Sequence, residues 1–198
     1  MSSKTEQAKL IALIHWIDQT TGGLSLPADE KSMIAAGCFD VVLEHQAAIA
    51  ALYSVGLNGS LLAILRVLAE SLIRGLWLTH AATERDIHRF KKGKLPSIKE
   101  MIDAFESTID TPNGVLSRFK ETGWNALCGF THTGFNQITR RHSPGLIGSN
   151  YADSEIAKAL GVAGALGLIA ASQIVGMAGR EDLVDCLMER MNDYAALP

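Results

Sequence analysis

The stretch LLAILRVLAESLIRGLWL, residues 61–78, has the length and apolar content of a helix that is buried on nearly all sides. Its three charged residues, Arg66, Glu70 and Arg74, are spaced four apart, so they lie in one row along that helix. Burying an unpaired ion is costly, because the charge loses its hydration. The row must therefore form internal ion pairs, line a water-filled groove or bind an anion.

A purely structural role for this row is one of the alternatives. Glu70 can pair with Arg66 and Arg74 to form an ion-pair ladder along the helix. Asp40 and Glu44, on the preceding predicted helix, can neutralise the surplus positive charge.

Hydrophobic residues recur with helical period along most of the chain, and no segment shows the alternation of a strand. We predict an all-α, single-domain bundle of six to seven helices over residues 1–198. The predicted helical segments are 4–20, 25–56, 60–93, 97–110, 115–140 and 153–196, the last bent around 176–179.

Start signals support several of these segments. Ser60 and Asp153 are expected to cap the helices that follow them. Ser97 and Glu100 have the spacing of a capping box. Residues 151–198 are predicted to form a helix pair, rich in small residues, that packs on the bundle or on a dimer partner.

Residues 159–179 carry no charge over a length that can span a bilayer. Their apolar character comes mostly from alanine and glycine, and no aromatic belt flanks them. We therefore expect a buried helix–helix contact and no membrane span. The close approach would use two pairs of small residues, Gly161 with Ala165 and Gly167 with Ala171.

Composition narrows the function classes. The net charge of −3 in 198 residues argues against a broad surface that coats nucleic acid, although a local basic groove remains compatible. The three cysteines form no CxxC pair and are expected to be reduced core thiols, and the polar N-terminus lacks a secretory signal. We expect a cytoplasmic protein. HExxH, P-loop, GxGxxG and nucleophile-elbow motifs are absent from the sequence.

A second concentration of polar residues is WNALCGFTHTGFNQITRRH, residues 124–142. If this segment is helical, His132, Asn136 and Arg140 share one face, with Arg141 beside them. A histidine near an arginine suits phosphodiester cleavage without metal, because imidazole can move a proton and guanidinium stabilises charge on phosphorus. The alternative is a polar helix end that carries a structural histidine.

Two segments, RVLAESLIRGLWL (66–78) and WNALCGFTHTG (124–134), resemble the HEPN superfamily, and in particular a divergent bacterial branch of it. The resemblance covers residues 30–140. It implies a helical bundle that is commonly a dimer. It also implies cleavage of RNA without metal through an Arg-x4–6-His motif, in a stress, phage-defence or toxin–antitoxin setting with an antitoxin-type partner.

The family histidine maps onto His132. Asn125 and Ala126 stand where the family pattern places its arginine, so the missing cation could come to His132 from the Arg66–Glu70–Arg74 row, across a helix–helix groove. A literal Arg-x5-His pattern occurs elsewhere, from Arg74 to His80. We therefore predict that His132, Arg140 and Arg74 are catalytic, and that the substrate-binding residues are Arg66, Glu70, Asn136, Arg141 and Asn125.

Two further patterns have structural interpretations. His80, Glu84 and His88 are spaced four apart as metal ligands can be, but nearby arginines favour a solvated face, and no metal or cofactor is predicted. The three tryptophans, at 16, 77 and 124, are expected to be core anchors.

Two functions remain. The first is a HEPN-like, metal-independent endoribonuclease or an RNA- or nucleotide-binding protein. The second is a catalytically silent helical module for interaction or dimerisation.

Overall fold

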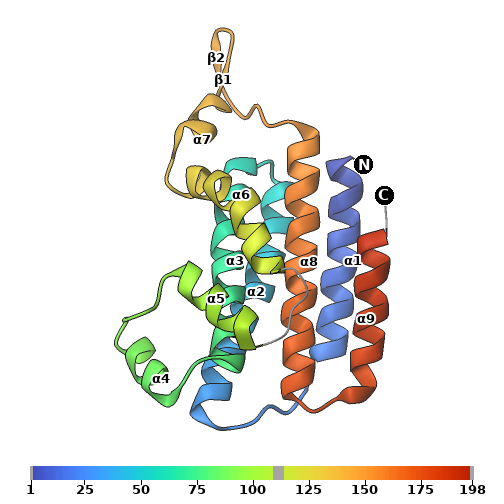
Figure 1. Cartoon of the computed structure of the whole chain (residues 1–198). Coiled ribbons are helices and arrows are strands. Elements are labelled where there is room, and N and C mark those ends of the chain that lie inside the picture. The colour runs from blue at the N-terminus through green and yellow to red at the C-terminus, as the bar shows by residue number, and fades with distance from the viewer. Residues whose placement is uncertain (1, 109–113, 197–198) are drawn as a thin grey trace.

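The computed structural model describes residues 2–108 and 114–196, and within them the chain forms nine helices and one short hairpin (Figure 1). The helices are α1 (Ser3–Thr21), α2 (Glu30–Ser54), α3 (Asn58–His80), α4 (Glu84–Lys91), α5 (Ile98–Thr108), α6 (Val115–Thr131), α7 (Phe135–Thr139), α8 (Asp153–Met177) and α9 (Glu181–Ala196). Strands β1 (His142–Ser143) and β2 (Leu146–Ile147) pair antiparallel, with His142 opposite Ile147. The all-α prediction is confirmed. The helices outnumber the predicted six to seven because the segments 60–93 and 115–140 are each divided in two, while the segment 153–196 forms the expected helix pair.

Helix α3 lies at the centre of the main core. It packs most extensively on α2, and it also contacts α5, α6 and α8. Leu61, Leu68 and Leu78 are fully buried, as its near-continuous apolar sequence requires. At Gly75 the ring of Phe39 on α2 comes so close that a Cβ would lie 2.5 Å from a ring carbon. The predicted buried helix is thus the central helix of the fold.

The predicted extension of this helix to residue 93 is wrong. Helix α3 ends at His80, and α4 begins after a capping box in which Thr83 and Asp86 exchange hydrogen bonds. A break in the helix is favourable here, because the Thr83 and Asp86 side chains each accept a hydrogen bond from a backbone N–H group at the start of α4.

The predicted helix starts are correct only in part. The capping box at Ser97 and Glu100 is present. Ser60 is not a cap, because α3 begins two residues earlier and Leu57 precedes it without a side-chain bond. Asp153 is the first residue of α8, and its carboxylate accepts hydrogen bonds from the backbone and hydroxyl of Ser3 instead of capping its own helix.

Helix α8 is surrounded by α1, α2, α3 and α9 (Figure 1). Its glycines admit side chains from two of these helices. A Cβ on Gly167 would lie 2.1 Å from Nε2 of Gln46 on α2, and a Cβ on Gly164 would lie 1.9 Å from the hydroxyl of Tyr194 on α9. The small residues of α8 thus serve packing inside this chain. Burial raises the pKa of Tyr194 to about 12.

By length and hydropathy, α2 and α8 could each cross a bilayer. In the fold, 39% of the most apolar window of α2 and 56% of that of α8 are buried. A core helix meets the same criteria, so this finding does not assign either helix to a membrane.

The cysteines and the tryptophans are less buried than the sequence predicts. Cys38 and Cys128 are half-buried, and Cys186 is exposed, so the prediction of a core position for Cys186 is wrong. Trp77 is buried at 4% exposure, as a core anchor should be. Trp124 is only half-buried, and its ring belongs to the polar site described below.

The β1–β2 hairpin projects from one end of the bundle (Figure 1). Pro144 and Gly145 form its turn, and Gly145 has a φ of +78°, which glycine adopts without strain. Leu146 and Ile147 are 72% and 84% exposed. The neighbouring Phe135 at the start of α7 is 82% exposed.

Candidate functional site

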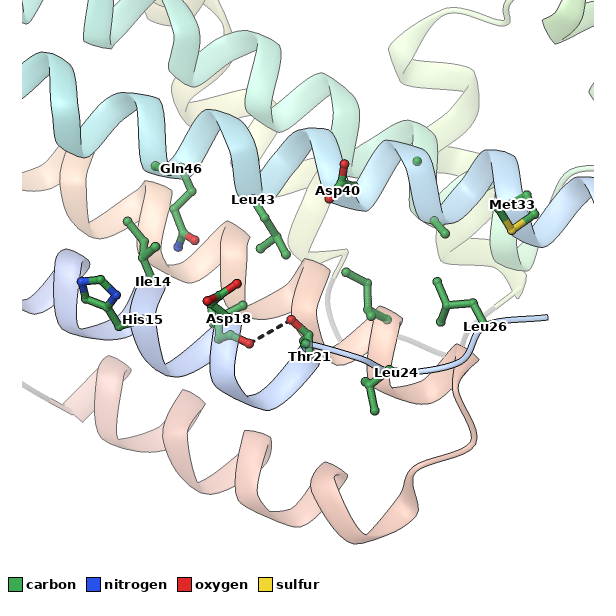
Figure 2. Close-up of a pocket in the computed structure, with 16 residues that line it drawn as sticks. Ile14, His15, Asp18, Thr21, Leu24, Leu26, Met33, Asp40, Leu43 and Gln46 are labelled. Atoms are coloured by element: carbon green, nitrogen blue, oxygen red, sulfur yellow. Dashed lines mark hydrogen bonds between the residues drawn. The ribbon is translucent and has the colours of Figure 1, made fainter. Parts of the chain in front are cut away.

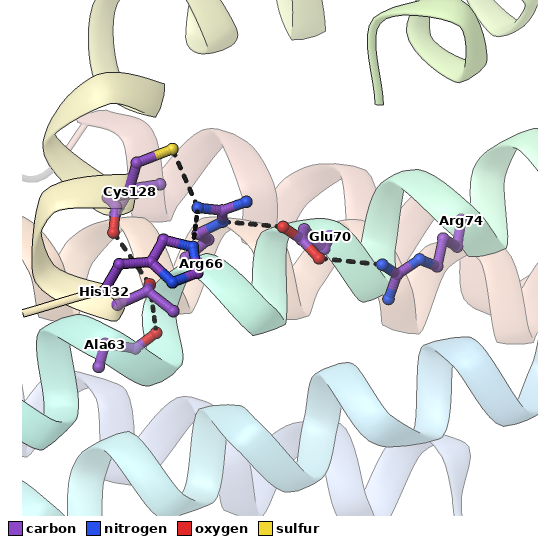
Figure 3. A network of polar contacts seen from close by, with 8 residues as sticks. Ala63, Arg66, Glu70, Arg74, Cys128 and His132 are labelled. Atoms are coloured by element: carbon purple, nitrogen blue, oxygen red, sulfur yellow. Dashed lines mark hydrogen bonds and ion pairs between the residues drawn. The ribbon is translucent and has the colours of Figure 1, made fainter. Parts of the chain in front are cut away.

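Arg66 on α3 is the centre of a polar network that joins α3 to the end of α6 (Figure 3). Its Nη1 lies 3.0 Å from Nε2 of His132 and donates a hydrogen bond to Sγ of Cys128, also at 3.0 Å. Its Nε donates to Oε1 of Glu70 at 2.8 Å. The guanidinium also lies over the ring of Trp124, with Cζ 5.4 Å from the ring centroid. Arg66 therefore has a fixed position with partners on both helices.

Trp124, Cys128 and His132 belong to one face of α6, because they are spaced four residues apart. All three side chains contact Arg66, the first residue of the Arg66–Glu70–Arg74 row of α3, which has the same spacing. The end of α6 is fixed on α3 by the hydroxyl of Thr131, which donates to the carbonyl of Ala63 at 3.3 Å. The site is thus the point where the α6 row converges on Arg66.

His132 is exposed and occupies the C-cap of α6. Thr133 follows with a φ of +54°, and Gly134 is the N-cap of α7. The predicted continuous helix over 115–140 is therefore broken here. The chain reverses behind His132, so Asn136 and Arg140 do not share one helical face with it.

Arg140 is not part of this network in the region that the structure describes. Both of its donor groups facing α8 bind Glu155, Nε at 2.8 Å and Nη2 at 2.7 Å. Its Nη1 donates to the carbonyl of Asn136, and its guanidinium lies over the Phe130 ring. The bonds with Glu155 raise the pKa of Arg140. The prediction of Arg140 as the cation next to His132 is corrected: Arg66 occupies that place.

Arg74 lies two helical turns from Arg66, roughly 12 Å along the axis. Its Nη2 donates to Oε2 of Glu70 at 2.9 Å, so Glu70 bridges both arginines. The Nε of Arg74 is buried, with no partner among the described residues. Arg74 can therefore act on the site through Glu70, whereas the arginine that contacts His132 is Arg66.

The row carries one negative charge between two positive charges. Asp40 and Glu44 are both exposed, and in the described part of the chain neither forms an ion pair with the two arginines. Glu70 is thus their carboxylate partner, and one positive charge of the row stays unneutralised. This surplus favours an anion at the exposed end near His132.

The remaining predicted contact residues lie around the network. The Asn136 side chain packs over Gly129, where a Cβ would come within 3.3 Å of its Nδ2. Asn125 is exposed on α6, and Arg141 is exposed at the base of the hairpin. Within the described residues, no hydrogen bond or ion pair links these three side chains to Arg66 or His132.

The literal Arg-x5-His pattern does not form a pair. Nε2 of His80 lies 2.7 Å from Oε1 of Gln173 on α8, and its ring lies against Phe105. The alternative metal site at His80, Glu84 and His88 is divided by the end of α3. No group of three His, Cys, Asp or Glu residues able to hold a metal occurs in residues 2–108 and 114–196.

Sequence reasoning missed Cys128 and Trp124 as members of the site. The signal was present, because the spacing of 124, 128 and 132 repeats that of 66, 70 and 74. The predicted row instead extends in the other direction, from His132 to Asn136 and Arg140. That extension fails because the helix ends at Thr131.

A profile of the Family of unknown function (DUF6988) matches residues 39–197, and the chain belongs to this family. The matched region begins inside α2 and includes the whole Arg66–His132 network. No curated protein and no solved structure matches the chain.

Proposed function

We propose that this member of the DUF6988 family is a HEPN-like, metal-independent endoribonuclease whose reaction centre is the pair Arg66 and His132. The observation that supports the proposal is the 3.0 Å contact between Nη1 of Arg66 and Nε2 of His132. The contact joins a cation and a proton-transfer group, which cleavage of a phosphodiester without metal requires.

In the proposed reaction, Nε2 of His132 is the atom that accepts and returns the proton. Arginine only donates hydrogen bonds, so Nε2 of His132 must be the acceptor in this contact and carries a lone pair. That lone pair can remove the proton from a ribose 2′-hydroxyl. The 2′-oxygen then bonds to phosphorus while the bond from phosphorus to the 5′-oxygen breaks. His132 returns the proton to the leaving 5′-oxygen, which gives a cyclic 2′,3′-phosphate and a 5′-hydroxyl.

Arg66 would stabilise the charge that develops on the phosphoryl oxygens. Its Nε is held by Glu70, and its face is supported by the Trp124 ring, so the Nη groups point in a fixed direction. The contact between Arg66 and His132 would open when a phosphate enters between them. Arg74 would act at a distance, by sharing the Glu70 carboxylate.

The test is cleavage of a labelled RNA in buffer with EDTA. We expect His132→Ala and Arg66→Ala to slow cleavage at least about 100-fold. Arg74→Ala should slow it by about threefold to tenfold, because its effect passes through Glu70. His88→Ala and Arg85→Ala are the matched controls, since both residues are exposed on α4. Equal cleavage by the wild type and His132→Ala would contradict the proposal.

The setting implied by the resemblance is part of the proposal as well. It includes the cytoplasm, a role in stress response, phage defence or a toxin–antitoxin pair, a homodimer and an antitoxin-type partner. Co-purification from the native host with the products of neighbouring genes would test the antitoxin-type partner. A stable complex that blocks RNA cleavage is the expected result.

A second candidate function is a catalytically silent module for dimerisation. The observation that favours it is the exposure of three large apolar side chains, Phe135 on α7 and Leu146 and Ile147 on β2. The double variant Leu146→Ser and Ile147→Ser should convert a dimer into a monomer in analytical ultracentrifugation. A wild type that is monomeric at high concentration would exclude this candidate.

A further inference from the structure

A cavity of about 740 Å³ lies between α1 and α2, away from the Arg66–His132 network (Figure 2). It forms because both helices pack more extensively on α8 than on each other. Ile14 and Leu43 come from the two facing helices, and Ile174 of α8 also lines the cavity. Its volume is within the range of pockets that bind small organic molecules.

The lining is mainly apolar, which suits a hydrocarbon or aromatic body. Besides Ile14 and Leu43, it includes Leu24, Leu26 and Met33, which close the end near the α1–α2 connection (Figure 2). Burial of such a body would provide most of the binding free energy.

The charged residues of the lining are of one sign. Asp18 on α1 and Asp40 on α2 both line the cavity, and both are exposed at its rim. The lining contains no lysine or arginine, and His15 is the remaining titratable group. The rim therefore favours a positively charged group over a negatively charged one.

Gln46 adds a hydrogen-bonding group to the wall of the cavity. Its side chain lines the cavity, although the residue is only 1% exposed. Its Nε2 donates to the carbonyl of Ala163 at 3.2 Å, which fixes the orientation of the amide. Its Oε1 is not one of the fully buried polar atoms that lack a partner, so this oxygen stays accessible, and an N–H group of a ligand could donate a hydrogen bond to it.

We propose that this cavity binds a small organic cation, namely an amine attached to an aliphatic or aromatic body. The body would occupy the apolar interior, and the ammonium would lie near the Asp18 and Asp40 carboxylates. The inference is independent of the proposed nuclease function, because the cavity shares no lining residue with the Arg66–His132 network.

The experiment uses three probes with one body and different charges: 4-phenylbutylamine, 4-phenylbutanol and 4-phenylbutyrate. Binding to the full chain is measured by calorimetry and by NMR chemical-shift changes. We expect the amine to bind at least about tenfold more tightly than the acid and about threefold more tightly than the alcohol. Equal binding of the three probes, or no binding of the amine at about 5 mM, would overturn the proposal.

Two variants assign the effect to this cavity. The double variant Asp18→Asn and Asp40→Asn should reduce the affinity for the amine to that for the alcohol. Ala47→Phe, at an exposed position of the lining, should weaken binding of the amine and the alcohol alike. The matched control is Glu84→Gln with Glu121→Gln, which makes the same charge change at exposed positions on α4 and α6. Unchanged binding of the amine by the Asp18 and Asp40 variant would refute the assignment.

Discussion

Helices α3 and α8 are both central and both long, but they are buried in opposite ways. Helix α3 fills its surroundings with large side chains such as Leu68 and Leu72, which are almost fully buried. Helix α8 presents Gly164 and Gly167, and its neighbours fill the space with Tyr194 and Gln46. The comparison shows two ways to bury an apolar helix. Its own large side chains can fill the core, or its small residues can leave space that side chains of neighbouring helices fill.

The difference extends to polar groups. Helix α3 carries its own charges and pairs them on its surface through Glu70. Helix α8 has no charge in its apolar middle and instead offers backbone carbonyls, such as that of Ala163, to Gln46. One helix brings polar side chains to the site, and the other accepts a polar side chain from α2.

The largest expected effect comes from removing volume on α3. Leu68→Ala should lower the free energy of unfolding by about 3 kcal/mol, because the residue is fully buried and the cavity would collapse only in part. Ala163→Gly is the counterpart on α8, and should cost about 1 kcal/mol. Urea denaturation measures both values. A smaller loss for Leu68→Ala than for Ala163→Gly would invalidate the comparison.

A smaller effect is expected from adding volume on α8. Gly167→Ala should cost about 1–2 kcal/mol, because its Cβ would overlap the buried amide of Gln46. In the background of Gln46→Ala the same substitution should cost nothing or stabilise, since the overlap is gone.

Gly176→Ala is the control for the helix preference of alanine over glycine. It lies on the same helix, and a Cβ there would meet nothing within 4 Å. It should stabilise the protein by a few tenths of a kcal/mol. A double-mutant cycle by urea denaturation gives the coupling between 46 and 167, and a coupling of zero would contradict the contact.

The third prediction concerns the charges of α3. Glu70→Gln should lower the free energy of unfolding by about 1 kcal/mol, because it leaves two half-buried arginines without their carboxylate. Asp103→Asn removes one carboxylate from the exposed pair with Lys99, and should cost less than about 0.5 kcal/mol. If the two variants were equally stable in thermal denaturation, Glu70 would have no special structural role.

The smallest expected effect is a pH dependence at the start of α8. The hydrogen bonds from Ser3 hold the pKa of Asp153 below its usual value. The carboxylate therefore stabilises the fold above its pKa in the unfolded chain, and this contribution is lost as pH falls through the lower pKa of the folded state.

Asp153→Asn should consequently be less stable than the wild type near neutral pH, and the difference should shrink below about pH 4. Denaturation curves at several pH values measure this difference. Ser3→Ala, which removes one donor, should show the same trend. A difference that stayed constant down to pH 2 would show that Asp153 contributes through its shape and not through its charge.

The fold class and the row on α3 could be predicted from the sequence, because both depend on spacing within one helix. The sequence also offers His132 as a partner of the row, with the row's own acids as the alternative, but spacing does not say which of the two the row faces. Arg66 and Arg140 are equally plausible neighbours of His132 in sequence terms. Only the fold brings Glu155 to Arg140 and leaves Arg66 next to His132.

Two errors in the predicted elements have local causes. The first is the predicted continuation of the helix to residue 93: Thr83 and Asp86 form a capping box that ends it, but the strong apolar periodicity before Thr83 favoured a continuous helix. The hairpin strands have two residues each, which is too few for an alternating pattern to appear in the sequence.

The bond between Ser3 and Asp153 also has a consequence for the time course of synthesis. Helix α1 packs mainly on α8, and the two bonded residues are 150 positions apart. A ribosome adds roughly 5–20 residues per second, so about 8–30 s separate the emergence of the two helices. During that interval the apolar face with Leu10, Leu13 and Ile17 lacks its main partner and has only α2 to pack on. On the ribosome the first helix therefore cannot complete its packing until the penultimate helix has emerged.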